Sequence, residues 1–169
     1  MIEDLKKDNI FYKNYEIINF INTNDIEKKL ILEWRNNDDV RKWMINKDLI
    51  TIEEHFNYIE SLKNNKKKLC FLLKEKNDYL GIVEFDEINN NSASFGINKN
   101  IMSTKKGLGE LLEKLSIYIA KTKLNINKLT LSVLKDNIRA IELYNKSNYS
   151  IKYEKEIYNN ILIYMEKKL

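Results

Sequence analysis

The stretch STKKGLGELLEKL, Ser103 to Leu115, is the part of the sequence that decides the fold. The whole chain has 4 glycines and no proline, yet Gly107 and Gly109 stand one residue apart here. The leucines around and after them recur at helical spacing, which predicts a helix of about four turns beginning at the glycines. A helix start presents unpaired backbone N–H groups and a partial positive charge, so it attracts anions. Without side chains in the way, a phosphate could reach those N–H groups.

Lys105 and Lys106 add positive charge beside the same turn, which favours a seat for a pyrophosphate. The motif is not a P-loop, because no Gly-Lys-Ser/Thr follows it. It also lacks the third glycine and the distant acid of a dinucleotide-binding fingerprint. Glycine at a helix start can equally be plain capping. On the motif alone, the two interpretations are equally good.

Composition narrows the class of protein. A chain of 169 residues with 43% hydrophobic and 32% charged residues is long enough for one globular domain with a full core. It contains no apolar run of about eighteen residues, so we expect no membrane span, and the single Cys70 lies in the apolar run LCFLL as a buried thiol. One cysteine and one histidine argue against a transition-metal site. A net charge of +4 without a basic stripe argues against nucleic acid. We expect a cytoplasmic protein.

Periodicity predicts the order β-α-α-β-β-β-α-β-α-β-β. Strands are predicted at 15–21, 69–74, 79–88, 92–98 and 128–134, and in a last pair split near 157–160. A first helix is predicted from about 25 to 36, with Ile26, Leu30 and Trp34 on one face, and a second at 51–63, which begins with a Thr51–Glu54 capping box. Two more helices are predicted, one from Gly107 onward and one at 136–147 capped by Asp136. Residues 1–14 are expected to be a solvated lead-in. The prediction is a single α/β domain with a mixed, mostly antiparallel sheet flanked by helices, not a doubly wound one.

The second half of the chain carries two motifs in sequence. KKGLGE follows a predicted strand and opens a long helix, and VLKDNIRAIELYNKSNY, Val133 to Tyr149, contains the pattern N-x-x-A-x-x-L-Y. Together they resemble the GNAT acetyltransferase superfamily, whose acetyl-CoA motif is [Q/R]-x-x-G-x-[G/A]. The resemblance implies the GNAT fold and acetyl-CoA as cosubstrate, with no metal. Thr104 departs from the pattern, since it stands where Gln or Arg is usual, which puts one phosphate contact in doubt.

The resemblance also implies which residues hold acetyl-CoA. Asn137 would contact the pantetheine arm, Ala140 would face the cofactor, and Tyr144 would lie near the sulfur and protonate the departing thiolate. Alternatively, Tyr144 is simply a core aromatic. Backbone groups of SFGIN would hold pantetheine and stabilise the oxyanion, because the family's strand splays from its neighbour here. The residues expected at acetyl-CoA are Phe95, Gly96, Ile97, Asn98, Thr104, Lys105, Lys106, Gly107, Leu108, Gly109, Glu110, Asn137, Ala140 and Tyr144.

EWRNNDDVRKWM, Glu33 to Met44, bears on the acceptor. It resembles a signature of ribosomal-protein N-terminal acetyltransferases and, in more detail, of the nucleotide-sugar acetyltransferases of pseudaminic acid synthesis, a pathway that supplies sugars for flagellin glycosylation. The second resemblance extends over nearly the whole chain and implies a UDP-linked 4-amino-4,6-dideoxy sugar whose C4 amine takes the acetyl group directly in a ternary complex. Two alternatives stay open, an N-terminal acetyltransferase of a ribosomal protein and a CoA-binding regulatory domain without turnover.

In this interpretation residues 15–98 form the acceptor side and residues 99–169 the acetyl-CoA side. Arg35 could pair with phosphate in a forked geometry, and Trp43 and Met44 offer surface for uracil or the sugar. Alternatively, Arg35 forms a salt bridge at a helix end. By the resemblance His55 reaches the nucleotide; otherwise it is a surface histidine.

Glu84 is the expected general base, because an inward-pointing acid on an apolar strand is unusual, although a strand glutamate can simply face solvent. Exposed aromatics near the terminal strands, Tyr153, Tyr158 and Tyr164, would permit a homodimer.

Overall fold

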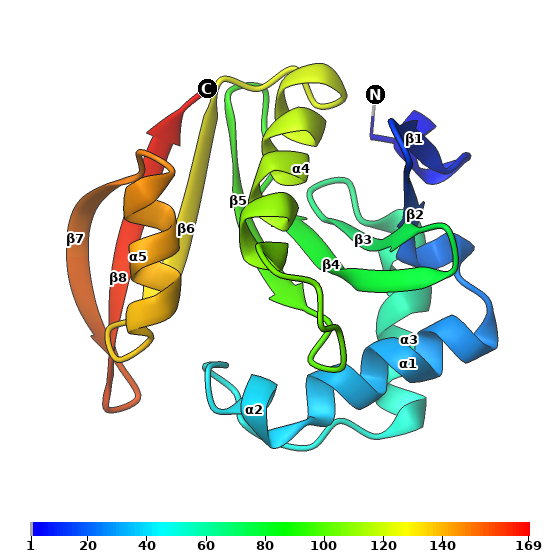
Figure 1. Ribbon diagram of the computed structural model, residues 1–169, viewed down its shortest axis with the longest axis horizontal. Helices are drawn as coiled ribbons and strands as arrows, with labels where there is room; N and C mark the ends of the chain where they lie inside the picture. Colours follow the sequence, from blue (N-terminus) through cyan, green and yellow to red (C-terminus); the bar gives the residue numbers. More distant parts are fainter. Residues whose placement is uncertain (1) are drawn as a thin grey trace.

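The computed structural model describes residues 2–169, and these residues form one eight-stranded sheet in the order β1-β2-β3-β4-β5-β6-β8-β7 (Figure 1). Neighbouring strands within it are antiparallel except β5 and β6, which run parallel. The strands are β1 Ile10–Tyr12, β2 Tyr15–Asn19, β3 Leu69–Glu75, β4 Asp78–Asp86, β5 Ser92–Lys99, β6 Lys128–Leu134, β7 Ser150–Ile157 and β8 Asn160–Lys168. The helices are α1 Asp25–Asn36, α2 Asp38–Arg41, α3 Ile52–Ser61, α4 Leu108–Thr122 and α5 Ile138–Lys146. The predicted fold class is confirmed.

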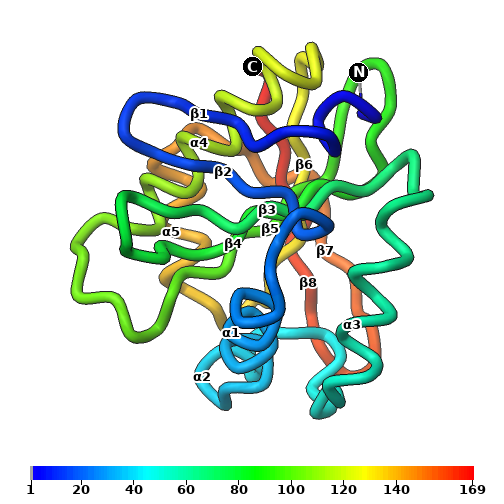
Figure 2. The backbone as a smooth tube through the Cα atoms, turned by 90° about the vertical axis from the view of Figure 1, so that its right-hand side faces the viewer, coloured from blue at the N-terminus to red at the C-terminus, as the bar shows by residue number. Residues whose placement is uncertain are grey.

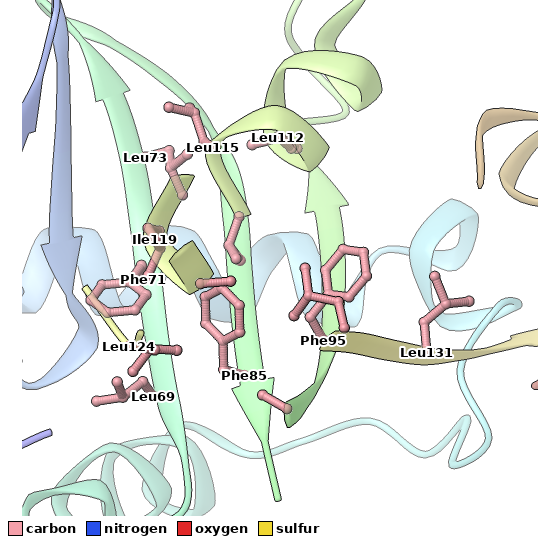
Figure 3. Close-up of a cluster of buried hydrophobic side chains, with 14 of the residues drawn as sticks. Leu69, Phe71, Leu73, Phe85, Phe95, Leu112, Leu115, Ile119, Leu124 and Leu131 are labelled. Atoms are coloured by element: carbon pink, nitrogen blue, oxygen red, sulfur yellow. The ribbon is translucent and has the colours of Figure 1, made fainter. Parts of the chain in front are cut away.

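Helices cover both faces of the sheet and enclose two cores (Figure 2). The larger core lies under α4 and α5, where Phe71, Phe85 and Phe95 meet Leu112 and Ile119 (Figure 3). The smaller core lies under α1 and α3 and includes Ile31, Trp34, Ile59, Cys70 and Leu72. Neighbours along β3 alternate between the two cores because strand side chains alternate between faces, so β3 is buried on both sides.

Local capping signals start the helices as the sequence predicts. Asn24 caps α1 and Thr51 caps α3, each in a complete capping box with the glutamate three residues later. Two predictions were wrong in detail. Ile26 is 79% exposed, because α1 turns Ile31 and Trp34 inward instead. The cap of α5 is Asn137 and not Asp136, since the Asn137 Oδ1 accepts the Ala140 N–H at 3.3 Å.

The expectation of a solvated lead-in over residues 1–14 was also wrong for the part that the structure describes; Met1 lies outside the described residues. Strand β1 pairs with β2, and Leu5 and Ile10 are buried. The Lys6 Nζ donates to the backbone carbonyls of Lys63 and Asn65 at 2.9 and 2.8 Å. The segment therefore covers one edge of the larger core.

The sheet opens between β5 and β6. These two strands pair only from Ser92 to Ser94, against Lys128 to Thr130, whereas β5 stays paired with β4 to its end and β6 with β8 along its length. We call the unpaired stretches, 95–99 of β5 and 131–134 of β6, the wedge. Helices α4 and α5 both begin near the end of the sheet at which β5 and β6 have separated (Figure 1). No helix in residues 2–169 has the length and apolar character needed to span a bilayer.

Candidate functional site

Backbone groups of β5 face into the wedge. The Asn100 N–H donates to the Leu80 carbonyl at 2.8 Å, so the antiparallel register makes Gly96 and Asn98 hydrogen-bonded partners of β4. The backbone N–H and C=O groups of the residues that alternate with them, Phe95 and Ile97, then point away from β4 and toward β6. Phe95 stands at the apex, directly after the last paired residue, and Ile97 is the next whose N–H and C=O face the wedge. Of the four residues expected here, Phe95 and Ile97 aim their backbone at the wedge, and Gly96 and Asn98 aim theirs at β4.

The first turn of α4 provides backbone N–H groups without a side-chain cap. Gly107 is the N-cap residue, has φ of 70° and makes no capping hydrogen bond. Its left-handed conformation favours glycine, and a Cβ there would meet no atom within 4 Å. Leu108 is buried, so it offers only its backbone. This geometry fits an anion such as the pyrophosphate of coenzyme A.

Gly109 has a different reason to be glycine. A Cβ at this position would lie 3.3 Å from the Cδ2 atom of Leu143 on α5. The missing side chain therefore lets α4 and α5 approach each other, in addition to any effect on phosphate access. The exposed Glu110 follows in the first turn of α4.

The two lysines before Gly107 differ in their surroundings. The Lys105 ammonium pairs with Glu75 and lies 5.5 Å from the ring centroid of Tyr15, so its charge is directed to β2 and β3. Thr104 and Lys105 line a pocket of about 390 Å³ beside Trp34 and Tyr79. Lys106 is exposed and forms no ion pair within residues 2–169. Lys106 is therefore the lysine beside the anion seat that has no acidic partner in the described chain, and a role for Lys105 there stays a prediction.

Helix α5 places Tyr144 at the apex of the wedge. Its ring is 5.9 Å from Phe95 and 5.5 Å from Tyr149 by centroids, in edge-to-face contacts. No group in residues 2–169 hydrogen-bonds its hydroxyl. Burial, and to a lesser extent the Glu113 carboxylate, raise the pKa of Tyr144 above its usual value, so the phenol is protonated at neutral pH. Ala140, one turn earlier, is half-buried.

Glu84 lies on the opposite face of the sheet. It is paired with Cys70 on β3 and Gly96 on β5, so its side chain points to the face that carries α1 and α3. Burial raises the pKa of Glu84, whereas Lys68 and Arg35 lower it by a smaller amount. A Cβ on Gly96 would meet no atom within 4 Å, so the space beside the carboxylate is open. Tyr144 and Glu84 thus approach the wedge from its two faces.

Arg35 and a second arginine hold the loop that follows α2. The Arg35 Nη2 donates to the Asn46 carbonyl at 2.9 Å, and the Arg41 Nη1 donates to the Lys47 carbonyl at 2.7 Å. The Arg35 Nη1 and the Arg41 Nε are buried and have no hydrogen-bond partner in residues 2–169. Burial and the charge of Arg41 lower the pKa of Arg35, while Glu84 and Asp48 oppose them. Arg35 makes no ion pair within the described chain, so the salt-bridge alternative does not hold.

Trp43 and Met44 lie in the same loop, 42–50. Trp43 is 39% exposed and Met44 is half-buried. His55 does not join them. It is 5% exposed, its Nε2 has no partner in residues 2–169, and burial, the larger effect, lowers its pKa. It lies beside Lys28 of α1, and seven residues separate Lys28 from Arg35, about 10 Å along the helix axis. The alternative of a surface histidine was wrong, because α3 turns His55 inward, whereas its contact with the nucleotide stays a prediction.

A family model described as an acetyltransferase (GNAT) domain matches residues 18–150 of this chain. The chain belongs to the GNAT acetyltransferase family. Acetyltransferase PseH of Campylobacter jejuni subsp. jejuni serotype O:23/36 (strain 81-176) is 31% identical over 145 residues, which cover 86% of this chain and 90% of that protein. The enzyme of the same name from serotype O:2 (strain ATCC 700819 / NCTC 11168) is 33% identical over 133 residues, which cover 79% of this chain and 83% of the relative.

Solved structures agree with the family assignment. The crystal structure of Campylobacter jejuni N-acetyltransferase PseH in complex with acetyl coenzyme A superposes with a TM-score of 0.74 at 26% identity, covering 91% of this chain and 98% of that one. Spermidine N-acetyltransferase from Vibrio cholerae in complex with CoA and spermine gives a TM-score of 0.82 at 18% identity, covering 92% and 95%, and shows the shared fold.

Membership of the GNAT family makes this protein an acetyl-CoA-dependent N-acetyltransferase, with acetyl-CoA as its cosubstrate. The chain's own residues fit that molecule, since the uncapped first turn of α4 suits its pyrophosphate and the outward groups of Ile97 suit the amides of its pantetheine arm. No cluster of three or more His, Cys, Asp or Glu side chains within residues 2–169 could hold a metal ion.

Sequence reasoning missed several polar residues of this GNAT enzyme. Arg41 was not singled out, although it holds loop 42–50 together with Arg35. Glu113 and Tyr149 are buried behind Tyr144, where the half-buried Lys167 contacts both, and these three residues were not considered. The one available signal was Glu113, which stands among the leucines of a helix expected to pack on the sheet.

Proposed function

We propose that this enzyme acetylates the C4 amine of a UDP-linked 4-amino-4,6-dideoxy sugar, a step of pseudaminic acid synthesis, by direct transfer in a ternary complex. The similarity to two Campylobacter acetyltransferases named PseH over most of the chain supports this acceptor class. The observation that carries the mechanism is the position of Tyr144 and Glu84 on opposite faces of the wedge. A base on one face and an acid on the other suit an acceptor and a donor that meet between β5 and β6.

The donor side would use backbone groups for most of its contacts. N–H groups of the first α4 turn, from Gly107 to Glu110, bind the pyrophosphate, and the exposed Lys106 adds charge. The Ile97 backbone faces the pantetheine arm, and β5 amides at the wedge stabilise the negative charge that develops on the acetyl oxygen. Asn137 keeps its Nδ2 available for pantetheine, since its Oδ1 is used in capping α5.

Glu84 and Tyr144 would handle the protons. The amine nitrogen forms a bond to the acetyl carbon as the bond from that carbon to sulfur breaks. Glu84 takes the amine proton, and the raised pKa of its carboxyl makes it a stronger base than an exposed glutamate. Tyr144 donates its phenolic proton to the leaving sulfur and regains one from solvent, where the proton held by Glu84 is released. The products are the N-acetyl sugar and free coenzyme A.

The acceptor side would bring the diphosphate to Arg35, with Trp43 and Met44 in the same loop offering apolar surface. His55 has no role in this proposal, because it is buried.

A comparison of two classes of acceptor tests the proposed substrate directly. The purified enzyme is incubated with acetyl-CoA and either the UDP-linked amino sugar or peptides that match ribosomal-protein N-termini, and products are identified by mass spectrometry. Acetylation of the sugar supports the proposal. Acetylation of a peptide with an untouched sugar would assign the enzyme to the N-terminal acetyltransferases, and no turnover of any acceptor would favour a CoA-binding regulatory domain.

A further inference from the structure

A buried polar group lies behind Tyr144 and has no part in the mechanism proposed above. Glu113 of α4 is 3% exposed, although most of the other buried side chains of that helix are apolar. Its Oε1 is 3.5 Å from the Nζ of Lys167 on β8. The hydroxyl of Tyr149 is buried nearby and has no hydrogen-bond partner in residues 2–169. Burying a polar group costs free energy unless the group is hydrogen-bonded or paired, so the Tyr149 hydroxyl calls for an explanation.

The position of the ion pair is informative. Lys167 is paired with Leu129 on β6, and Leu129 with Ala93 on β5, so Lys167 stands beside the short stretch where β5 and β6 are still joined. Glu113 reaches it from α4, which packs on the other half of the sheet. The ion pair therefore joins the two halves of the sheet just behind the apex of the wedge.

A chain of contacts leads from this ion pair to the proposed acid. The Lys167 Nζ lies 5.3 Å from the centroid of the Tyr149 ring. That ring is 5.7 Å from Phe95 and 5.5 Å from Tyr144. Burial raises the pKa of both phenols, and the nearby Glu113 carboxylate raises the pKa of each further.

Stability alone is a poor explanation for the ion pair. The Glu113 side chain is 4% exposed and that of Lys167 is 20% exposed, so the carboxylate loses most of its hydration, and this loss offsets much of the attraction between the two charges. An ion pair that holds two elements in one geometry has a clearer benefit next to a reaction centre, because small displacements of a reacting group lower the reaction rate.

We propose that Glu113 is a positioning residue for Tyr144: paired with Lys167 it fixes α4 against β8 and, through Tyr149, sets the place of the Tyr144 phenol at the wedge apex. The inference rests on the proposed role of Tyr144 as the proton donor. It assigns Glu113 no contact with either substrate.

A double-mutant cycle tests the inference. Glu113→Gln, Tyr144→Phe and the double variant are compared by steady-state kinetics, with Glu142→Gln, an exposed glutamate of α5, as the matched control. We expect Glu113→Gln to lower kcat about tenfold, because the interaction between Glu113 and the proton donor Tyr144 is lost. KM for acetyl-CoA should stay within about twofold of the wild-type value. The double variant should be no slower than Tyr144→Phe alone, and Glu142→Gln should match the wild type.

Equal losses from Glu113→Gln in the wild-type and Tyr144→Phe backgrounds would overturn the inference, as would an unchanged kcat, while the role of Tyr144 would stand. A Tyr144→Phe enzyme with full activity would instead remove Tyr144 from the mechanism and the inference with it. If circular dichroism shows that Glu113→Gln does not fold, Glu113→Gln/Lys167→Met removes both charges and is taken through the same cycle, with the same outcomes deciding.

Discussion

Glu84 on β4 stands directly opposite Gly96 on β5, and a side chain on Gly96 would meet no atom within 4 Å. The carboxylate therefore has open space beside it at the wedge, on the face of the sheet away from Tyr144. An acid in this position can reach an amine that approaches from the side of α1 and loop 42–50. The following predictions come from this arrangement and from the residues around it.

Glu84→Gln should remove the acidic limb of the pH–rate profile and lower kcat about a hundredfold, the range of general-base catalysis. Burial raises the pKa of Glu84, so the wild-type rate should fall, as pH decreases, at a higher pH than an ordinary glutamate would cause. Steady-state rates across pH measure this, with the exposed Glu33→Gln on α1 as control. An acidic limb that persists in Glu84→Gln would belong to the substrate amine and contradict the role of Glu84.

Tyr144→Phe should lower kcat by tens to hundreds while the affinity for acetyl-CoA stays the same, because the change removes a proton donor and keeps the ring. The ring contacts with Phe95 and Tyr149 should survive the substitution. Tyr118→Phe is a suitable control. The Tyr118 ring stacks on the Tyr12 ring, with 3.9 Å between their centroids, and this contact involves none of the wedge residues. Unchanged turnover would show that Tyr144 is a core aromatic only.

Gly107→Val should abolish measurable binding of acetyl-CoA by calorimetry. Valine at φ of 70° is strained, and its side chain would project into the open space before α4, where the pyrophosphate is proposed to bind. Lys114→Ala, an exposed change on the same helix, should bind normally. Normal binding by a folded Gly107→Val protein would contradict the anion seat.

Arg35→Ala should raise KM for the UDP-sugar by about tenfold or more, because a charged contact with phosphate is lost. KM for acetyl-CoA should change little. Arg41→Ala is the matched control, since Arg35 and Arg41 each hold loop 42–50 through one carbonyl. If both variants raise KM for the sugar equally, Arg35 acts only by holding the loop, and its contact with phosphate is refuted.

His55 should make the fold lose stability as the pH falls below about 6.5, the ordinary pKa of histidine. Burial lowers its pKa in the folded state, so over the window between the two values the unfolded chain binds a proton that the folded chain does not. The loss should be at most about 1.4 kcal/mol per pH unit. Urea unfolding at neutral and mildly acidic pH measures it, and a His55→Gln variant with the same pH dependence would rule His55 out as the cause.

The fold could be predicted largely from local signals. Capping boxes at Asn24 and Thr51 and the glycines at the start of α4 act within a few residues, so the sequence alone reveals them. Which face of a helix is buried is harder to predict, because it depends on contacts with residues far away in the sequence. Glu27 in α1 is buried because it accepts a hydrogen bond from the hydroxyl of Tyr79 on β4, and Ile26 is turned outward as a result.

The candidate site was predictable in part for the same reason. The motifs marked Gly107 and Asn137, which cap their own helices, and Tyr144, which lies in the second motif itself. The pairing of Lys105 with Glu75 was not predicted because the two residues are 30 positions apart, and Glu113 was missed because Lys167 is 54 positions away. Side chains that meet only after the sheet has formed leave no periodic signal in the sequence.

The most direct test is the structure of the enzyme with coenzyme A and the UDP-linked amino sugar bound together. We predict the pyrophosphate on the first turn of α4, the pantetheine arm between β5 and β6, and the C4 amine facing Glu84 with the sulfur near the Tyr144 hydroxyl. Coenzyme A bound away from the wedge, or the amine bound on the same face of the sheet as Tyr144, would contradict that arrangement.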